Sequence, residues 1–273
     1  MSGAPAVQLR DAALRFGART LWSSLDLDVE AGELLAVLGP NGSGKTTLLR
    51  VLLGQQSLSS GRVLVLGQPP RSARLEVAYV PQQRAFNAST PLRGRDLVRF
   101  GVDGHRWGVA VPWSPGARDA RARVDAALDS VNAAEYAEAR LGRLSGGEQQ
   151  RLRIAQALAA RARLLLCDEP LLSLDLRHQR QVVDLVHRSR QAMGSSVVFV
   201  THEINPVIAH VDRVLYLVNG RHRIGSVDEV MNTATLSELY GTEVDVLRTR
   251  GRLVVVTGAD HDSHHDSDVE GEA

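Results

Sequence analysis

The sequence predicts an α/β protein built around a mainly parallel sheet. Short apolar runs rich in valine and leucine recur along the chain without alternating polar residues. Strands that are buried on both faces of a parallel sheet have this pattern, because helices cover each face. Helical segments separate several of these runs, which is the α/β arrangement. Of the 273 residues, 44% are hydrophobic and 23% are charged, which suits a globular protein and excludes a disordered or fibrous one.

The individual elements follow from local patterns. The expected strands are, in chain order, residues 34–38, 63–66, 164–167, 197–200 and 214–218. Residues 117–139 place Val124, Leu128 and Val131 at helical spacing among charged residues, which predicts an amphipathic surface helix. Residues 147–160 are rich in the helix formers Ala, Leu, Gln and Arg. Gly, Pro and Trp crowd residues 100–116 and predict a loop there, within a helical subdomain spanning about residues 84–160.

The C-terminal part divides into a folded segment and a tail. Thr235 to Glu238 match a helix capping box, Gly241 matches a helix stop, and residues 253–256 predict a strand. Residues 258–273 carry six acids, three histidines and no basic residue, so we expect a disordered tail after a domain of residues 1–257. The formal net charge of +1 therefore combines a body of +7 with an acidic end. This near balance argues against a dedicated nucleic-acid binder.

The strongest functional signal is a phosphate-binding loop at residues 39–46. GPNGSGKT fits G-x-x-x-x-G-K-[ST], follows the apolar run 34–38 and leads into a helix-forming segment. Its glycines let backbone N–H groups turn toward phosphate oxygens, at the positive end of the following helix. An ordinary glycine-rich turn is the alternative. The predicted nucleotide-binding residues here are Gly39, Pro40, Asn41, Gly42, Ser43, Gly44, Lys45, Thr46 and Thr47.

Lys45 is the only lysine in the chain, among 31 arginines. Its compact ammonium suits the β- and γ-phosphates of a nucleotide, whereas the planar fork of arginine would not reproduce that point charge. The hydroxyl of Thr46 is a ligand for Mg²⁺.

A carboxylate pair, Asp168 and Glu169, follows the expected strand 164–167. Ligands of open α/β sheets bind at the carboxyl ends of the strands, where one acid could bind a metal and the next could act as a base for water. A solvated turn would also explain the pair by itself, and the phosphate-binding loop favours the functional interpretation.

Further motifs resemble those of the ATP-binding cassette (ABC) ATPases. LSGGEQQR, at residues 144–151, lies between the phosphate-binding loop and Asp168 and resembles the signature motif of that family. The resemblance covers residues 7 to about 240. The remaining matches are Gln82 in AYVPQQ to the Q-loop glutamine, Ser173-Leu-Asp175 to the D-loop, His202 after VVFVT to the switch histidine, and Phe16 to the aromatic that stacks on adenine.

The resemblance implies ATP and Mg²⁺ as cofactors. It also implies the fold of a P-loop NTPase of the ABC type, with an antiparallel β subdomain and an inserted helical subdomain beside the parallel core. In this family Ser145, Gly146 and Gly147 of one subunit contact the γ-phosphate held by another, so a single copy of the motifs implies a head-to-tail homodimer. The implied roles are Glu169 to polarise the attacking water, Asp168 and Thr46 to hold Mg²⁺, Gln82 to complete the metal and water shell, His202 to contact the γ-phosphate, and Asp175 to belong to the ATP site. Taken singly, Gln82 could cap a loop, and His202 and Phe16 could be core residues.

The chain resembles a stand-alone transporter ATPase. It has no signal-peptide pattern and no run of roughly 20 apolar residues that would span a bilayer. Its one cysteine, Cys167, permits no intramolecular disulfide, which agrees with a reducing compartment. We expect a peripheral subunit on the cytoplasmic face, bound to an integral membrane permease that an extracytoplasmic substrate-binding protein serves.

The cargo suggested by the resemblance is a divalent metal ion. PLRGRDLVRFG is similar to a segment of importers for metal ions and metal chelates, and THEINPVIAHVDRVLYLVNGR and LSELYGTEVDVLR are similar to segments of zinc and manganese importers. The histidines and acids of the tail are ligands for these metals, although a solvated tail explains them equally. Trp107 and Trp113 could form a groove for the permease or anchor their own loop. The alternatives are an iron-chelate importer, an exporter ATPase, and a soluble ABC protein that acts on ribosomes or DNA.

Overall fold

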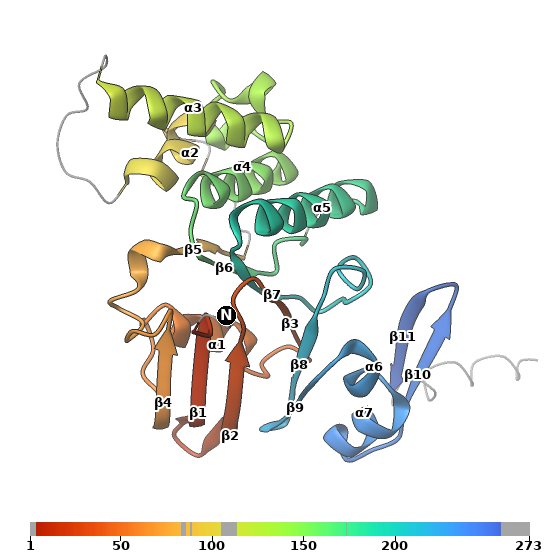
Figure 1. The fold of residues 1–273 in the computed structure, drawn as a ribbon. Helices are drawn as coiled ribbons and strands as arrows, with labels where there is room; N and C mark the ends of the chain where they lie inside the picture. Colours follow the sequence, from red (N-terminus) through yellow and green to blue (C-terminus); the bar gives the residue numbers. More distant parts are fainter. Residues whose placement is uncertain (1–3, 83–85, 88, 105–113, 173, 258–273) are drawn as a thin grey trace, which may run out of the picture.

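The computed structural model describes residues 4–82, 86–87, 89–104, 114–172 and 174–257 (Figure 1). The predicted tail, Trp107, Trp113 and Ser173 lie outside these ranges.

A six-stranded sheet forms the centre of the protein, in the order β5-β6-β7-β3-β8-β9. The first five strands run parallel and β9 pairs antiparallel with β8. The strands expected at 34–38, 164–167, 197–200 and 214–218 are confirmed, as is the α/β class. The bounds are β5 (Val77–Val80), β6 (Leu164–Asp168), β7 (Ser196–Val200), β3 (Leu34–Leu38), β8 (Arg213–Val218) and β9 (Arg221–Gly225).

An antiparallel sheet covers one face of this centre, as the resemblance implied. It has the order β2-β1-β4 and comprises β1 (Val7–Phe16), β2 (Arg19–Val29) and β4 (Ser60–Val65). The assignment of residues 63–66 to the parallel sheet is wrong, because β4 pairs with β1 and its first three residues are exposed. Leu35 and Val37 of β3 share a core with this sheet and with α1 (Lys45–Leu52).

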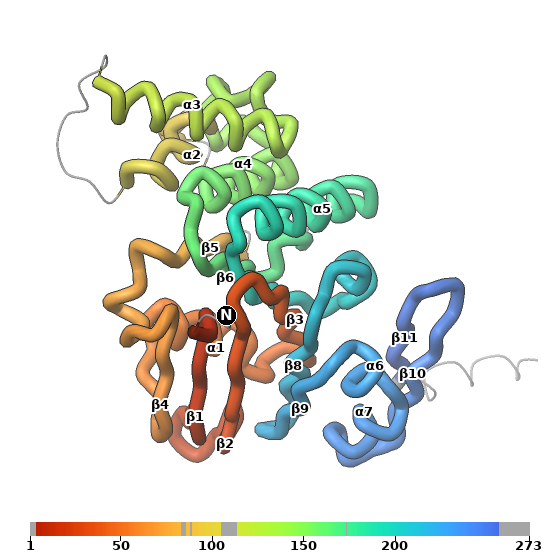
Figure 2. The backbone as a smooth tube through the Cα atoms, viewed as in Figure 1, coloured from red at the N-terminus to blue at the C-terminus, as the bar shows by residue number. Residues whose placement is uncertain are grey.

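The opposite face of β3 contributes to a second core. Leu34, Ala36 and Leu38 lie in one buried cluster with side chains of the helical region. Alternate residues of a strand point to opposite faces, so β3 joins the two halves of the protein. Figure 2 shows the chain passing from α2, α3 and α4 at one end of the molecule into the sheet.

The helical region differs from the prediction at both ends of the expected loop and at the end of the expected helix. α2 (Gly94–Asp103) occupies the first residues of the expected loop at 100–116, and α3 (Pro115–Ser130) begins before that loop was expected to end. The helix predicted over 117–139 ends early, because Asn132 adopts a left-handed φ of 53°. The helical region also contains α4 (Gly146–Ala159) and the short 3₁₀ turns Ala134–Tyr136 and Leu141–Arg143. Outside it lie α5 (Leu176–Met193) and the 3₁₀ turn Arg74–Glu76.

The C-terminal part forms two helices and a hairpin. They are α6 (Val227–Val230), α7 (Thr233–Tyr240), β10 (Val244–Thr249) and β11 (Arg252–Thr257). The predicted capping box at Thr235 is wrong: Asn232 caps α7 and accepts a hydrogen bond from the Thr235 N–H at 2.9 Å. Gly241 ends α7 in a left-handed conformation, as expected. Within the described ranges, no helix has the length and apolar character needed to cross a membrane.

Candidate active site

The phosphate-binding loop connects β3 to α1 at the carboxyl end of the central sheet. Gly39 and Gly44 have φ values of 137° and 101°, which L-residues with a side chain rarely adopt. A Cβ on Gly39 would also lie 2.0 Å from the Leu217 carbonyl oxygen. Glycine is therefore required by close packing on β8 as well as by backbone conformation. Pro40, Asn41 and Gly42 form the exposed part of the loop, and Thr47 lies half-buried in α1.

Lys45 is buried within this loop, with 5% of its surface exposed. Its Nζ donates to the carbonyl oxygens of Gly39 at 2.7 Å and Pro40 at 3.0 Å. Burial lowers the pKa of the ammonium, and the nearby carboxylates of Glu169 and Asp168 oppose that shift. These contacts hold the cation inside the loop that the sequence assigned to phosphates.

Ser43 supports a phosphate ligand independently of the motif. Its Oγ is buried and has no hydrogen-bond partner among the residues that the structure describes. A buried hydroxyl without a partner is unfavourable, and a phosphate oxygen would accept its hydrogen bond. The residues of the loop thus fit the phosphate chain of ATP.

Asp168 ends β6 and is 1% exposed. Its Oδ1 accepts a hydrogen bond from Thr46 Oγ1 at 3.0 Å, and its Oδ2 accepts one from Tyr79 Oη at 3.2 Å. Burial raises the pKa of the carboxyl group, and the two hydroxyl donors oppose the rise. Burial also raises the pKa of the Tyr79 phenol to about 12, with Asp168 adding to the effect.

Glu169 lies between two of the other predicted residues. Its Oε2 is 3.5 Å from Gln82 Nε2 and 3.6 Å from His202 Nδ1. Its side chain is 13% exposed, whereas that of His202 is 56% exposed. The structure therefore brings Lys45, Thr46, Gln82, Asp168, Glu169 and His202 into one continuous set, and these residues come from four separate parts of the sequence.

The signature segment, residues 144–151, has its own local structure. Ser145 caps α4 and forms a reciprocal capping box with Glu148, so its hydroxyl bonds within the segment. Gly146 and Gly147 begin the helix. Figure 1 shows α4 beside α2 and α3, while α1 lies beside β1 and β4. The hydrogen bonds recorded for Ser145 do not connect it to the phosphate-binding loop of its own chain.

Asp175 also acts as a helix cap in this structure. It begins α5 and accepts a hydrogen bond from the His178 N–H at 2.9 Å, while His178 Nδ1 lies 2.7 Å from its other carboxylate oxygen. These hydrogen bonds lower the pKa of Asp175. Its side chain is 64% exposed, and no recorded hydrogen bond places it at the nucleotide site of the same chain.

Phe16 lies at the end of β1 and is 50% exposed. It pairs with Arg19 across the β1–β2 turn, and Arg19 Nη2 donates to the Gly42 carbonyl oxygen at 2.8 Å. This bond connects the turn to the phosphate-binding loop. An exposed aromatic ring on that turn is available to a nucleotide base.

Sequence reasoning missed several residues that hold the site together. Tyr79 bonds Asp168, Arg19 bonds the phosphate-binding loop, and the buried Gln150 donates to the Pro170 carbonyl oxygen at 3.0 Å. Gln150 thereby joins α4 to the turn after Glu169. Tyr79 and Gln150 lie inside motifs that were recognised for other residues, so motif membership was the only signal for them.

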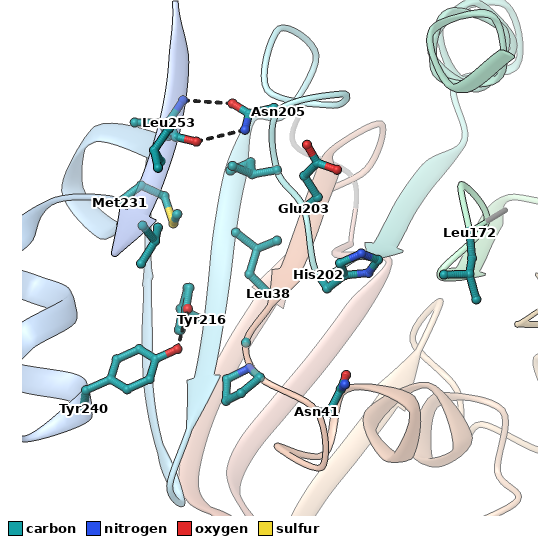
Figure 3. Close-up of a pocket in the computed structure, with 15 residues that line it drawn as sticks. Leu38, Asn41, Leu172, His202, Glu203, Asn205, Tyr216, Met231, Tyr240 and Leu253 are labelled. Carbon is teal, nitrogen blue, oxygen red and sulfur yellow. Dashed lines mark hydrogen bonds between the residues drawn. The ribbon is translucent and has the colours of Figure 1, made fainter. Parts of the chain in front are cut away.

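A cavity of about 740 Å³ opens beside the phosphate-binding loop (Figure 3). Its walls come from Asn41 in that loop, from His202 and Asn205 in the switch loop (residues 201–205), and from Leu253 on β11. The Asn205 side chain pairs with the Leu253 backbone like a neighbouring strand, at 2.9 Å to the carbonyl oxygen and 2.8 Å to the N–H. The C-terminal hairpin is therefore attached three residues after His202.

Replacing Asn205 by alanine should lower stability, because it removes both hydrogen bonds to Leu253. At about 1 kcal/mol for each bond, we expect a loss of about 2 kcal/mol, measured by denaturant unfolding. Asn87 is exposed and its side chain makes no hydrogen bond to another described residue, so Asn87→Ala serves as the control. Equal stability of the two variants would show that the Asn205 side chain does not help to hold the C-terminal hairpin.

Comparison with known proteins now identifies the family. Residues 22–172 match the family described as "ABC transporter". The chain belongs to the ABC transporter family. It is accordingly an ATP-binding protein with ATPase activity and uses ATP with Mg²⁺.

Relatives of this ABC ATPase extend over nearly the whole chain. A hemin import ATP-binding protein, HmuV of Streptomyces coelicolor, is 38% identical over 89% of this chain and 86% of the relative. A zinc transport system ATP-binding protein, TroB of Treponema pallidum, is 34% identical over 88% of each. Other relatives are named for manganese and phosphonate transport.

A solved structure shares the fold over a similar extent. It is described as an inward-facing conformation of a putative metal-chelate type ABC transporter, with a TM-score of 0.77 and 28% identity. The match covers 93% of this chain and 99% of that one.

Proposed function

We propose that this ABC ATPase drives an importer for a divalent transition metal, zinc or manganese, from the cytoplasmic face of the membrane. Its partners are a second copy of the chain, a separate membrane permease and an extracytoplasmic substrate-binding protein. The single observation that supports the ATPase site best is the convergence of Thr46, in the first turn of α1, with Asp168 and Glu169 at the carboxyl end of β6.

In this proposal the phosphate-binding loop holds the phosphates of ATP. Lys45 supplies the positive charge, and the backbone N–H groups at the start of α1 supply further donors. Ser43 Oγ, which has no partner in the described part of the chain, donates a hydrogen bond to a phosphate oxygen. The exposed ring of Phe16 stacks on the adenine.

Mg²⁺ fits the oxygen atoms that the site provides. Thr46 offers a hydroxyl, Asp168 a carboxylate and Gln82 an amide oxygen, and such hard donors suit this ion. When bound, Mg²⁺ neutralises charge that develops on the phosphates. The role of the protein is to hold these three side chains in position to bind the ion.

Glu169 is the proposed general base. A cavity of about 180 Å³ is lined by Glu169, Thr201 and His202 and has room for the attacking water. The contacts of Glu169 with Gln82 and His202 are long, so its carboxylate can accept a hydrogen bond from that water and then take its proton. His202, whose Nδ1 lies 3.6 Å from Glu169 Oε2, would contact the γ-phosphate that the water attacks.

A homodimer would complete the site. Ser145, Gly146 and Gly147 start a helix whose recorded bonds do not reach the phosphate-binding loop of the same chain. A second copy arranged head to tail would place them against the bound γ-phosphate, and Asp175 would lie at the same junction. Hydrolysis then waits for closure, because the full set of donors forms only when two copies meet.

In this proposal residues 1–257 form the ATPase domain, with the helical part at about 84–160, and 258–273 form an accessory tail.

The zinc or manganese assignment is supported by relatives named for those metals and by the similar sequence segments. Hemin is the second candidate cargo, because HmuV proteins are also similar over most of the chain.

Uptake of radioactive zinc, manganese and iron-labelled hemin should be compared in cells with and without the chain. A loss confined to zinc or manganese is expected. Loss of hemin uptake alone would replace the metal-ion assignment with the chelate.

A soluble ABC protein without a permease is the alternative from another class. Affinity purification of the tagged chain from detergent-treated membranes should recover an integral membrane protein. Recovery with ribosomes or DNA, and without a membrane protein, would overturn the transporter proposal.

A further inference from the structure

Each carboxylate oxygen of Asp168 accepts a hydrogen bond from a different hydroxyl group. Thr46 Oγ1 donates to Oδ1 at 3.0 Å, and Tyr79 Oη donates to Oδ2 at 3.2 Å. Thr46 belongs to the phosphate-binding loop, whereas Tyr79 comes from β5, the strand next to β6 in the sheet. Asp168 is 1% exposed, so its carboxylate has almost no contact with bulk solvent.

The strand register explains why Tyr79 reaches Asp168. Tyr79 pairs with Leu166, and Asp168 follows two residues later on the same face of β6. The Tyr79 ring packs against the buried cluster that contains Leu166 and the apolar side chains of α1. Its position is therefore set by apolar packing, and its hydroxyl is left to fix the carboxylate.

This arrangement matters for the metal that Asp168 would bind. With Oδ2 engaged by Tyr79, Oδ1 is the oxygen directed toward Thr46 and the phosphate-binding loop. Mg²⁺ requires compact octahedral geometry and is bound through few carboxylate oxygens, whereas Ca²⁺ readily accepts both oxygens of one carboxylate. A carboxylate that offers a single oxygen suits the smaller ion.

We propose that Tyr79 is a positioning residue that holds the Asp168 carboxylate so that one oxygen faces the metal, which favours Mg²⁺ over Ca²⁺. The proposal rests on the role of Asp168 in the proposed function. Tyr79 acts through Asp168 and does not touch the metal or the nucleotide. Removing its hydroxyl should free the carboxylate to rotate and to offer both oxygens.

The test uses Tyr79→Phe in the full-length chain, which keeps the ring and its packing. Binding of a fluorescent ATP analogue is measured while Mg²⁺ or Ca²⁺ is titrated. We expect the Mg²⁺ concentration for half-maximal binding to rise about tenfold, the usual scale when the partner of a metal ligand is removed. The concentration for Ca²⁺ should rise less, so the preference for Mg²⁺ narrows. Affinity for the analogue in EDTA should stay unchanged.

Tyr136→Phe is the matched control, because Tyr136 is another half-buried tyrosine and lies against Arg151 in the helical region. It should bind the analogue with the parental Mg²⁺ and Ca²⁺ dependence. A Tyr79→Phe protein with parental half-maximal concentrations for both ions would overturn the proposal.

Asp168→Asn separates this inference from the proposed function beneath it. If Asp168→Asn weakens the Mg²⁺ response and Tyr79→Phe does not, only the role of Tyr79 is wrong. If Asp168→Asn leaves the Mg²⁺ response intact, the metal assignment of Asp168 is wrong, and the role of Tyr79 falls with it.

Discussion

Glu169→Gln should retain ATP binding and lower the rate of hydrolysis by about 100- to 10 000-fold, the range that a positioned general base contributes. The substitution keeps the size of the side chain and its contacts with Gln82 and His202, but an amide does not take a proton from water. The bound ATP should then persist and favour a closed dimer. Phosphate release at saturating MgATP measures the first effect, and size-exclusion chromatography in ATP measures the second.

Glu203→Gln provides the control for this experiment. Glu203 is exposed on the switch loop next to His202, and its recorded hydrogen bonds to Thr201 use backbone atoms. This variant should hydrolyse ATP at nearly the parental rate. Near-parental turnover of Glu169→Gln as well would show that the base lies elsewhere.

Lys45→Arg should reduce ATP affinity by about 10- to 100-fold, the equivalent of one lost charged hydrogen bond, and abolish most hydrolysis. The chain uses arginine at its 31 other basic positions, so the substitution tests the one exception. Lys45 is 5% exposed and its Nζ is held by the Gly39 and Pro40 carbonyls. The larger planar guanidinium does not fit that space without moving the loop.

Fluorescent nucleotide binding measures the effect of Lys45→Arg, and a thermal melt without nucleotide verifies that the variant folds. Arg62→Lys makes the reverse exchange at an exposed position on β4 and should leave ATP affinity unchanged. Parental affinity of Lys45→Arg would mean that charge alone, without compact shape, is sufficient at this position.

Much of the fold was predictable because its signals are local. The runs at 34–38, 164–167, 197–200 and 214–218 are continuous and apolar, and the structure places all four in the central sheet. The errors occur where residues outside a segment determine its pairing or its end. Residues 63–66 look like a buried strand, yet β4 pairs with β1 in the antiparallel sheet. The helix expected to reach residue 139 ends at Ser130, before the left-handed Asn132.

The sequence by itself determined the phosphate-binding loop, since glycine conformation, lysine charge and the following helix act within eight adjacent residues. It also determined the family, because the motifs occur in a fixed order. Only the tertiary structure decided how Tyr79 reaches Asp168 across two strands and how Asn205 attaches the C-terminal hairpin. These contacts join residues 89 and 48 positions apart, and strand register and packing, which local patterns do not encode, bring them together.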